Sequence, residues 1–347
     1  MKMIDFRSDT ITKPTEEMRK AMYEAEVGDD VYKEDVTINK LEELAAEIVG
    51  KEAALFVPSG TMGNLLGVMT HTRNGQEIIL EEKSHIYNYE VTGYARLCGL
   101  GTRVIKGNKG KMGIVDIEDK IQNDNDIHHA ATGLICIENT HNTAGGIVLE
   151  PNYIKEVKTL SEKYNIPIHM DGARVFNVAT YLNQDVSTIT KDVDSVMFCL
   201  SKGLGAPVGS ILAGKEEYIE RARHNRKMLG GGMRQAGILA AAGIIAITKM
   251  TKRLQEDHDN IKLLAEGLSQ INGLGINLED VQTNILMVNI NISGMDSFKI
   301  CEELKKENIL ASPFGNKKIR FVTNYHITRK DIECTIERIN KIIKKVK

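Results

Sequence analysis

Short apolar runs alternate with helical segments through the first two thirds of this 347-residue chain. Helical spacing over 38–48 predicts a helix capped by Thr37 and ended by Gly50, and Pro151 opens another helix that runs to Tyr164. Because parallel strands are joined by long crossovers that are usually helices, this alternation predicts an α/β fold with a largely parallel, helix-covered sheet. The strand-like runs are 53–57, 77–80, 133–137, 166–170, 195–200 and 209–213.

The pattern changes near residue 250. A long helical stretch over 233–253 is followed by a helix, a strand over 285–290, a helix, a strand over 319–322 and a last helix. That last helix begins at Thr328, with Asp331 placed for a capping box. We therefore expect two domains joined by the long helix: an N-terminal segment plus a large α/β domain over 1–250, and a small C-terminal α+β domain over 251–347.

Charge and hydropathy exclude several classes of function. The formal net charge of −2 gives no general attraction to nucleic acid or to an anionic membrane. No segment approaches about 18 uninterrupted apolar residues, and the first residues lack a signal-peptide stretch. We expect a cytoplasmic protein with a small-molecule substrate, and neither nucleic acid nor membrane as a partner.

Two charged residues stand at the ends of two predicted strands. Asp171 follows the run 166–170 and Lys202 follows 195–200; the offset, 202 − 171 = 31 residues, is about one strand–helix–strand unit. Both side chains then lie at the edge where parallel α/β sheets build their sites. This pairing suits pyridoxal 5′-phosphate: Lys202 would form a Schiff base with the aldehyde, and Asp171 would keep the pyridine nitrogen protonated.

A loop of small residues supports this interpretation. Residues 59–64, Ser-Gly-Thr-Met-Gly-Asn, follow the run 53–57 and open a helix over 65–70. Backbone N–H groups at a helix N-terminus form a ready phosphate site. The loop is neither a Walker loop nor a dinucleotide fingerprint, which argues against ATP and NAD; alone, it would be equally typical of a simple turn.

Histidines supply candidate proton carriers. His85 follows the run 77–80 and could stack on a pyridine ring, while His141 follows 133–137 and could reach a substrate hydroxyl. A lone histidine is more often structural, so both assignments depend on Lys202 and Asp171. His128, His129 and His169 lack metal-ligand spacing, and we predict no metal site.

A series of motifs resembles the low-specificity L-threonine aldolases. They occur in the family's order at residues 5–10, 27–32, 59–64, 138–142, 171–174, 200–207 and 230–235. The resemblance implies a pyridoxal-phosphate enzyme of fold type I and reversible cleavage of L-threonine or L-allo-threonine to glycine and acetaldehyde. A β-eliminating lyase or an aminotransferase on the same fold is the alternative.

The resemblance also implies roles for individual residues. Lys202, Asp171, His85 and His141 form the catalytic set, and the base is His85, His141 or a water molecule. The cofactor set comprises Ser59, Gly60, Thr61, His85, Asp171, Arg174, Ser201, Lys202 and Arg234. The substrate set comprises Ser8, Tyr32, His141, Arg174 and Arg320.

The resemblance also bears on oligomeric assembly, and the chain differs from the family at one position close to the predicted site. Tyr32 and Arg234 match positions that the family lends across a subunit interface, which implies a homodimer or a homotetramer with shared sites. The family usually has a histidine where this chain has Asn324. That difference leaves Arg320 in place and changes the hydrogen bonding close to it.

Overall fold

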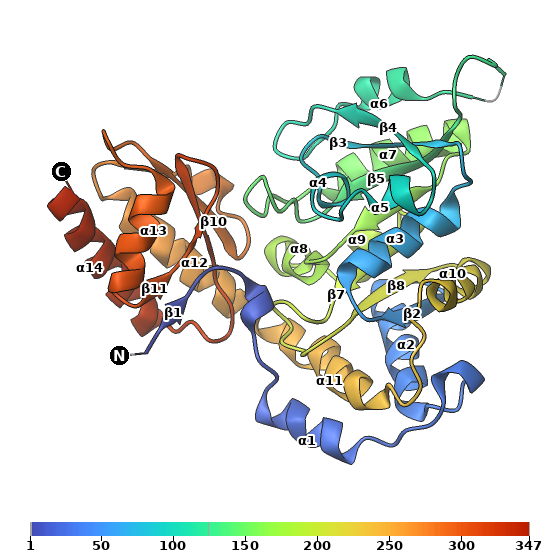
Figure 1. Cartoon of the computed structure of the whole chain (residues 1–347), viewed down its shortest axis with the longest axis horizontal. Helices are drawn as coiled ribbons and strands as arrows, with labels where there is room; N and C mark the ends of the chain where they lie inside the picture. The colour runs from blue at the N-terminus through green and yellow to red at the C-terminus, as the bar shows by residue number, and fades with distance from the viewer. Residues whose placement is uncertain (1, 124, 347) are drawn as a thin grey trace.

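The computed structural model describes residues 2–123 and 125–346. Figure 1 shows two bodies, a larger one built from the N-terminal two thirds and a smaller one built mainly from the C-terminal third. The larger body contains a seven-stranded sheet of order β2-β8-β7-β6-β5-β3-β4. Its strands are β2 (Ala53–Val57), β3 (Glu77–Glu81), β4 (Gly101–Ile105), β5 (Thr132–Glu138), β6 (Ile168–Asp171), β7 (Ser195–Cys199) and β8 (Ser210–Gly214).

The sheet confirms the predicted, mainly parallel α/β fold. Only β8 runs against its neighbours, β2 and β7, among the strand pairs of this sheet that the structure describes. β4 was not predicted, because it is a partly exposed edge strand interrupted by Arg103. The helices of this body are α1 (Glu16–Glu24), α2 (Val36–Val49), α3 (Gly60–His71), α4 (His85–Asn88), α5 (Gly93–Arg96), α6 (Ile114–Lys120), α7 (Pro151–Tyr164), α8 (Val175–Leu182), α9 (Val186–Thr190), α10 (Glu216–Met228) and α11 (Gly237–Thr248).

Several predicted helix boundaries were wrong. Asp35, rather than Thr37, caps α2: its Oδ1 accepts hydrogen bonds from the Thr37 and Ile38 amides at 3.2 and 3.0 Å. Thr37 instead donates its hydroxyl to the Glu26 carbonyl. The stretch 233–253 is not one helix, because α11 ends at Thr248 and a 3₁₀ turn, η3 (Met250–Arg253), precedes α12 (Leu254–Ser269).

The smaller body has its own sheet and its own core. Its antiparallel sheet has the order β12-β13-β10-β9, with strands β9 (Leu274–Gly275), β10 (Ile285–Ile290), β12 (Ser312–Pro313) and β13 (Lys318–Val322). It also contains α12, α13 (Ser297–Lys306) and α14 (Arg329–Val346). Thr328 and Asp331 form the predicted capping box, with hydrogen bonds of 2.9 and 3.3 Å.

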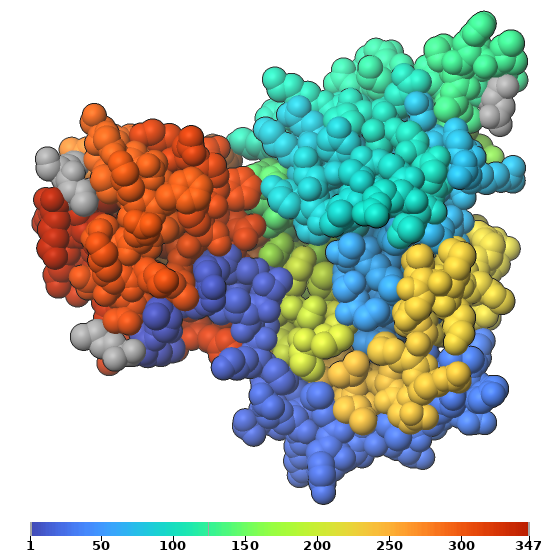
Figure 2. All heavy atoms as spheres, in the orientation of Figure 1, coloured from blue at the N-terminus to red at the C-terminus, as the bar shows by residue number. Residues whose placement is uncertain are grey.

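The N-terminal segment joins the smaller body. β1 (Ile4–Asp5) pairs in parallel with β11 (Ile309–Leu310), and Phe6 packs edge-on against Phe321. In Figure 2 these first residues, in blue, lie against the orange surface of the C-terminal third. The division near residue 250 stays a prediction; the separate core of the smaller body supports it, and this core also includes Ile4 and Phe6. Across the described residues no helix is long and apolar enough to cross a membrane.

Candidate active site

Two adjoining cavities open where β6 and β7 end. We call the first, of about 310 Å³, the α3 cavity, because the N-terminus of α3 closes it. We call the second, of about 410 Å³, the Arg320 cavity. His85, Asp171, Ala173 and Lys202 line both. The two residues predicted to lie at one edge of the sheet therefore do meet there.

The small residues at the start of α3 let the helix approach β7 closely. A Cβ atom on Gly60 would lie 2.9 Å from the Cys199 sulfur, and one on Gly63 would lie 2.6 Å from Met197 Cγ. Ser59 caps the helix, which begins at Gly60 rather than at residue 65 as predicted, by accepting a hydrogen bond from the Met62 amide at 3.2 Å. Ser59, Gly60 and Thr61 all line the α3 cavity, so the positive end of the helix favours an anion there.

Asp171 is the last residue of β6 and is held at both carboxylate oxygens. Oδ1 accepts the Ala173 amide at 3.1 Å, and Oδ2 accepts Asn64 Nδ2 at 2.9 Å. Asn64 in turn is held by His169, whose other ring nitrogen contacts Ser195 Oγ at 2.8 Å. Burial lowers the pKa of His169 to about 4, so this ring is neutral. His169 thus supports the residue that orients Asp171.

His85 forms a pair with a carboxylate that was not predicted. Its Nδ1 lies 2.8 Å from Glu90 Oε1, and the same oxygen accepts Asn64 Nδ2 at 2.7 Å. Burial alone would lower the pKa of His85, but the hydrogen bond that it donates to Glu90 and the charge of Asp171 outweigh burial and raise it. Burial also raises the pKa of Glu90. The pair therefore retains a proton more readily than either group would in water.

The same three side chains form a group with metal-ligand spacing. The ligand atoms of His85, Glu90 and Asp171 lie within 4.8 Å of one another. These residues also line the α3 cavity, where a ring held by Asp171 would sit. We therefore interpret the group as part of a cofactor site and retain the prediction that no metal binds.

Lys202 lies in the loop after β7, where its backbone is fixed by the N-terminal segment. Its carbonyl accepts Thr12 Oγ1 at 2.8 Å. Its side chain lines both cavities, whereas Ser201 lines only the α3 cavity. Lys202 therefore lies at the junction of the two cavities, where a group bound in one can react with a group bound in the other.

Two arginines meet at the far side of the Arg320 cavity. Arg174 Nη1 and Arg320 Nη1 both donate to Asn142 Oδ1, at 3.4 and 3.2 Å. Arg174 is also bound through Nε and Nη2 to the buried carboxylate of Asp9, each at 2.7 Å. Among the described residues Arg320 pairs with no carboxylate, and burial, followed by the charge of Arg174, lowers its pKa. This unbalanced positive charge, beside Ser8, suits a carboxylate ligand.

The structure does not bring every predicted residue to these cavities. His141 is buried, its Nε2 lies 3.1 Å from Glu81 Oε2, and it lines a different cavity. Tyr32 is 72% exposed and Arg234 donates to Asp29 at 2.9 Å on the surface; neither lines the site of its own chain. Asn324 is buried, and its Oδ1 accepts the His326 amide at 3.1 Å.

Sequence reasoning missed Asp9, Asn64, Glu90 and Asn142. Each is a polar residue that contacts a predicted site residue. None was identified by its position at the end of a predicted strand. Asp9, Asn64 and Asn142 do lie within the motifs that carried the family resemblance. A polar side chain within one of these motifs was therefore the signal that could have identified these three residues.

Comparisons with known proteins agree with this geometry. Residues 5–291 match the family model described as beta-eliminating lyase. Low-specificity L-threonine aldolase 1 of Arabidopsis thaliana is 43% identical, over 97% of this chain and 95% of that protein. The low specificity L-threonine aldolase of Escherichia coli K12 is 43% identical, over 95% of this chain and 96% of that protein. The chain therefore belongs to the beta-eliminating lyase family and, within it, to the low-specificity L-threonine aldolases.

Solved structures extend the likeness in fold. Threonine aldolase from Leishmania major superposes with a TM-score of 0.84 at 18% identity, covering 98% of this chain and 99% of that one. At this identity the match concerns the fold, which is fold type I of the pyridoxal-phosphate enzymes, as predicted.

Proposed function

We propose that this protein is a pyridoxal-phosphate-dependent aldolase that cleaves L-threonine and L-allo-threonine reversibly to glycine and acetaldehyde. The observation that carries the proposal is the position of Lys202 and Asp171 at the junction of two cavities. One cavity ends at the N-terminus of α3 and the other at a pair of arginines. Family membership favours the aldolase over the alternative β-eliminating lyase or aminotransferase.

The residues of the α3 cavity fit pyridoxal phosphate. When bound, this cofactor withdraws electrons from the bonds at the α-carbon of an amino acid. Ser59, Gly60, Thr61 and Ser201 would hold its phosphate end, and the Lys202 amine would bind its aldehyde carbon. Asp171, whose two oxygens are already oriented by Ala173 and Asn64, would keep the ring nitrogen protonated. His85 would lie against the ring.

The Arg320 cavity would orient the substrate. Ser8, Arg174 and Arg320 would bind the α-carboxylate, which leaves the amine directed toward Lys202. By fixing the orientation of the α-carboxylate, these residues would decide between Cα–Cβ cleavage and other reactions at the α-carbon.

We further propose that His85 takes the proton from the β-hydroxyl of the substrate. Its Nδ1 is engaged by Glu90, which leaves Nε2 to act in the cavity. An ordered water remains the second candidate. His141 is the weaker one, because Glu81 engages its Nε2 and the ring lines another cavity.

Product analysis tests the function. Purified protein with added pyridoxal phosphate should convert L-threonine to glycine and acetaldehyde. Formation of 2-oxobutanoate instead would establish elimination and overturn the proposal. Borohydride reduction followed by peptide mapping should label Lys202, and label on any other lysine would contradict its assignment.

Stereochemistry tests how the substrate is held. The α-carboxylate and amine have several contacts, whereas the β-hydroxyl has one, worth about 1 kcal/mol, or less than tenfold. We therefore expect L-threonine and L-allo-threonine to be cleaved at similar kcat/KM and D-threonine to be inert. Comparable cleavage of D-threonine would show that this view of carboxylate binding is wrong.

We also propose a homodimer or homotetramer with shared sites that works in the cytoplasm, in glycine formation and threonine breakdown. Tyr32 and Arg234 are exposed, and so are the apolar side chains of Val31 and Met228, as expected of a surface that a second copy covers. Mixing a Lys202→Ala chain with an Arg234→Ala chain should restore activity in hybrid dimers. Absence of complementation in proven hybrids would place Arg234 outside the partner's site.

A further inference from the structure

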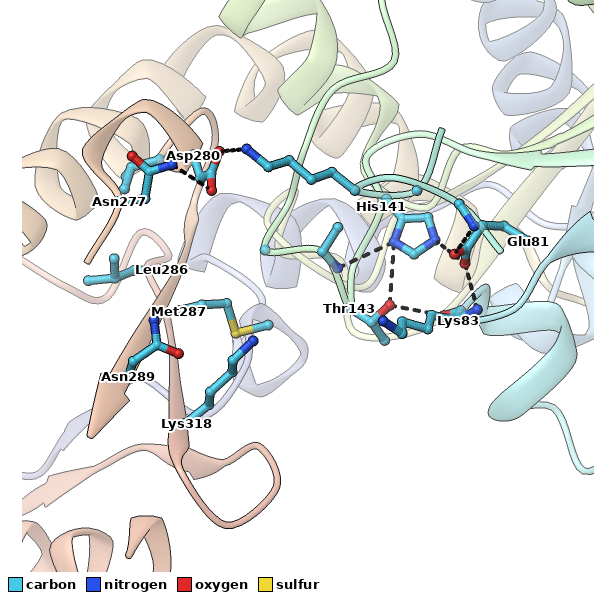
Figure 3. Close-up of a pocket in the computed structure, with 16 residues that line it drawn as sticks. Glu81, Lys83, His141, Thr143, Asn277, Asp280, Leu286, Met287, Asn289 and Lys318 are labelled. Carbon is cyan, nitrogen blue, oxygen red and sulfur yellow. Dashed lines mark hydrogen bonds and ion pairs between the residues drawn. The ribbon is translucent and has the colours of Figure 1, made fainter. Parts of the chain in front are cut away.

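A third cavity, of about 300 Å³, lies between the two bodies of the molecule and shares no lining residue with the α3 or Arg320 cavity. Figure 3 shows it, with His141, Glu81 and Lys83 on the side of the large body and Met287, Asn289 and Lys318 on the side of the small sheet. Apart from His141, the weaker candidate base, no residue that lines it has a role in the proposed aldolase mechanism.

The bottom of this cavity is formed by the buried side chains of Glu81 and His141, which contact each other. Glu81 accepts His141 Nε2 at 3.1 Å and also the amides of Lys83 and Gly107, at 2.5 and 3.2 Å. A Cβ on Gly110 would lie 2.4 Å from His141 Cγ, so only glycine lets this turn lie on the imidazole. The hydrogen bonds lower the pKa of Glu81 in spite of burial, and the surrounding carboxylates raise that of His141 in spite of burial. Both shifts favour the charged forms of Glu81 and His141, whose opposite charges offset each other.

The rim is positively charged. Three lysines line it, and Lys109 is paired with Asp280 at 2.5 Å, across the gap between the bodies. Lys83 has only a loose contact, 3.7 Å, with the neighbouring Glu82. Among the described residues, the Lys318 ammonium group has no hydrogen bond or ion pair. Figure 3 places Lys83 and Lys318 on opposite sides of the cavity. Lys318 therefore has no paired anion among the described residues, and Lys83 is balanced only by its 3.7 Å contact with Glu82.

We propose that this cavity binds a small dianion, either a short dicarboxylate or a phosphate ester, held between Lys83 and Lys318. Two ammonium groups on opposite walls match two negative charges on one molecule. The volume exceeds that of a bare phosphate ion and leaves room for a short carbon chain. Asn277, Asn289 and Thr143 supply further polar atoms at the wall.

Such a ligand would act on the Arg320 cavity through the small sheet. Lys318 and Arg320 are two residues apart on β13, so their side chains lie on the same face of the strand. Lys318 pairs with Asn289 of β10, and Arg320 pairs with Met287. On the other wall, His141 lines the third cavity while the next residue, Asn142, accepts Arg320. A dianion that bridges Lys83 and Lys318 would hold Arg320 close to Asn142. It should therefore lower the KM for L-threonine, an effect that rests on the proposed function.

Calorimetric titration of the holoenzyme tests the binding directly, with inorganic phosphate and succinate as separate probes at fixed ionic strength. We expect saturable binding of at least one probe. Lys83→Gln and Lys318→Gln should each weaken it about tenfold, and the double variant should abolish it. Lys330→Gln, which changes another exposed lysine on α14, is the matched control and should bind normally. The probe that binds identifies the dianion as phosphate ester or dicarboxylate.

Two results would overturn the site. One is no saturable binding of either probe up to about 50 mM, and the other is unchanged binding by the double variant. The Arg320→Gln variant separates the cavities: binding that disappears in it, but survives in the double lysine variant, belongs to the substrate cavity. Melting temperatures of all variants confirm folding. Because calorimetry needs no turnover, a failure of the aldolase assignment would leave the binding result intact, and only the KM effect would be lost.

Discussion

Two buried aspartates near the domain junction differ sharply in their surroundings. Asp9, in the N-terminal segment, accepts two hydrogen bonds of 2.7 Å from Arg174 and a third, of 3.2 Å, from Asn284. Asp257, in α12, accepts one hydrogen bond of 3.2 Å from Arg253. Its Oδ2 has no hydrogen-bond partner among the described residues.

The pKa values of these two carboxyl groups move in opposite directions. Burial alone would raise the pKa of Asp9, but the charge and hydrogen bonds of Arg174 outweigh burial and lower it to about 2. Burial dominates at Asp257 and raises its pKa to about 7, because Arg253 offsets only part of the cost. Burial thus does not decide whether an aspartate is charged; the number of donors aimed at it does. Asp9 does not line the Arg320 cavity itself but holds Arg174, which does.

Removing the better-paired aspartate should have the largest effect. Asp9→Asn leaves Arg174 buried without a counter-charge, and we expect the free energy of unfolding to fall by about 3–5 kcal/mol. Denaturant unfolding measures it. The control is Asp5→Asn, since Asp5 forms a similar two-point pair with Arg7, at 2.9 and 2.6 Å, on the exposed surface. That change should cost under about 1 kcal/mol. Equal losses of unfolding free energy in the two variants would show that the buried pair is no more important for stability than the exposed one.

Asp257 should make the protein less stable as the pH rises, whereas a well-paired aspartate makes it less stable as the pH falls. Because its folded pKa of about 7 lies above the usual aspartate value of 3.8, its favourable contribution is complete below pH 3.8 and is lost as the pH rises through 7. Asp257→Asn should remove this dependence. The stability of the variant relative to the parent should rise between pH 4 and pH 8, by up to about 4 kcal/mol.

Unfolding curves across this pH range, compared with Asp259→Asn on the exposed face of the same helix, provide the check. A constant difference between the Asp257 variant and the parent over the range would show that Asp257 is ionised throughout.

Arg320 should matter for substrate binding more than for stability. It donates to Asn142 Oδ1 and to the Arg7 carbonyl, both at 3.2 Å, but no buried carboxylate depends on it. We expect Arg320→Gln to raise the KM for L-threonine about tenfold and to change the unfolding free energy by under about 1 kcal/mol. Arg174→Gln should instead lose stability as well, because it leaves Asp9 unpaired. Steady-state kinetics and denaturant unfolding of both variants test these expectations. An Arg320→Gln variant as unstable as Arg174→Gln would contradict a role of Arg320 mainly in substrate binding.

The sequence predicted the central elements well, because their signals are local. The limits of β2, α7 and β10 were predicted to the residue, since apolar runs and Pro151 mark them. The break between α11 and α12 was missed because no proline or glycine lies in residues 249–253 to signal it locally.

The candidate site was predictable only in part, for a related reason. Lys202 and Asp171 follow strands of one parallel sheet, and this topology alone brings them together. Asp9 and Glu90 reach the site from segments whose approach depends on tertiary packing. His141 shows the limit most clearly: it neighbours Asn142, which faces the substrate cavity, yet its own ring points to the other side of the loop.

The pairing of β1 with β11 has a consequence for synthesis on the ribosome. Phe6 donates its amide to the Leu310 carbonyl at 2.7 Å, and its own carbonyl accepts the Val322 amide at 2.9 Å. Ser8, Asp9 and Thr12, which follow directly, line the substrate cavity or fix Arg174 and Lys202. About 300 residues must therefore emerge before the earliest segment finds its partner strand, so the larger sheet can fold during translation while the site stays open. Catalytic competence arrives only when the chain is nearly complete.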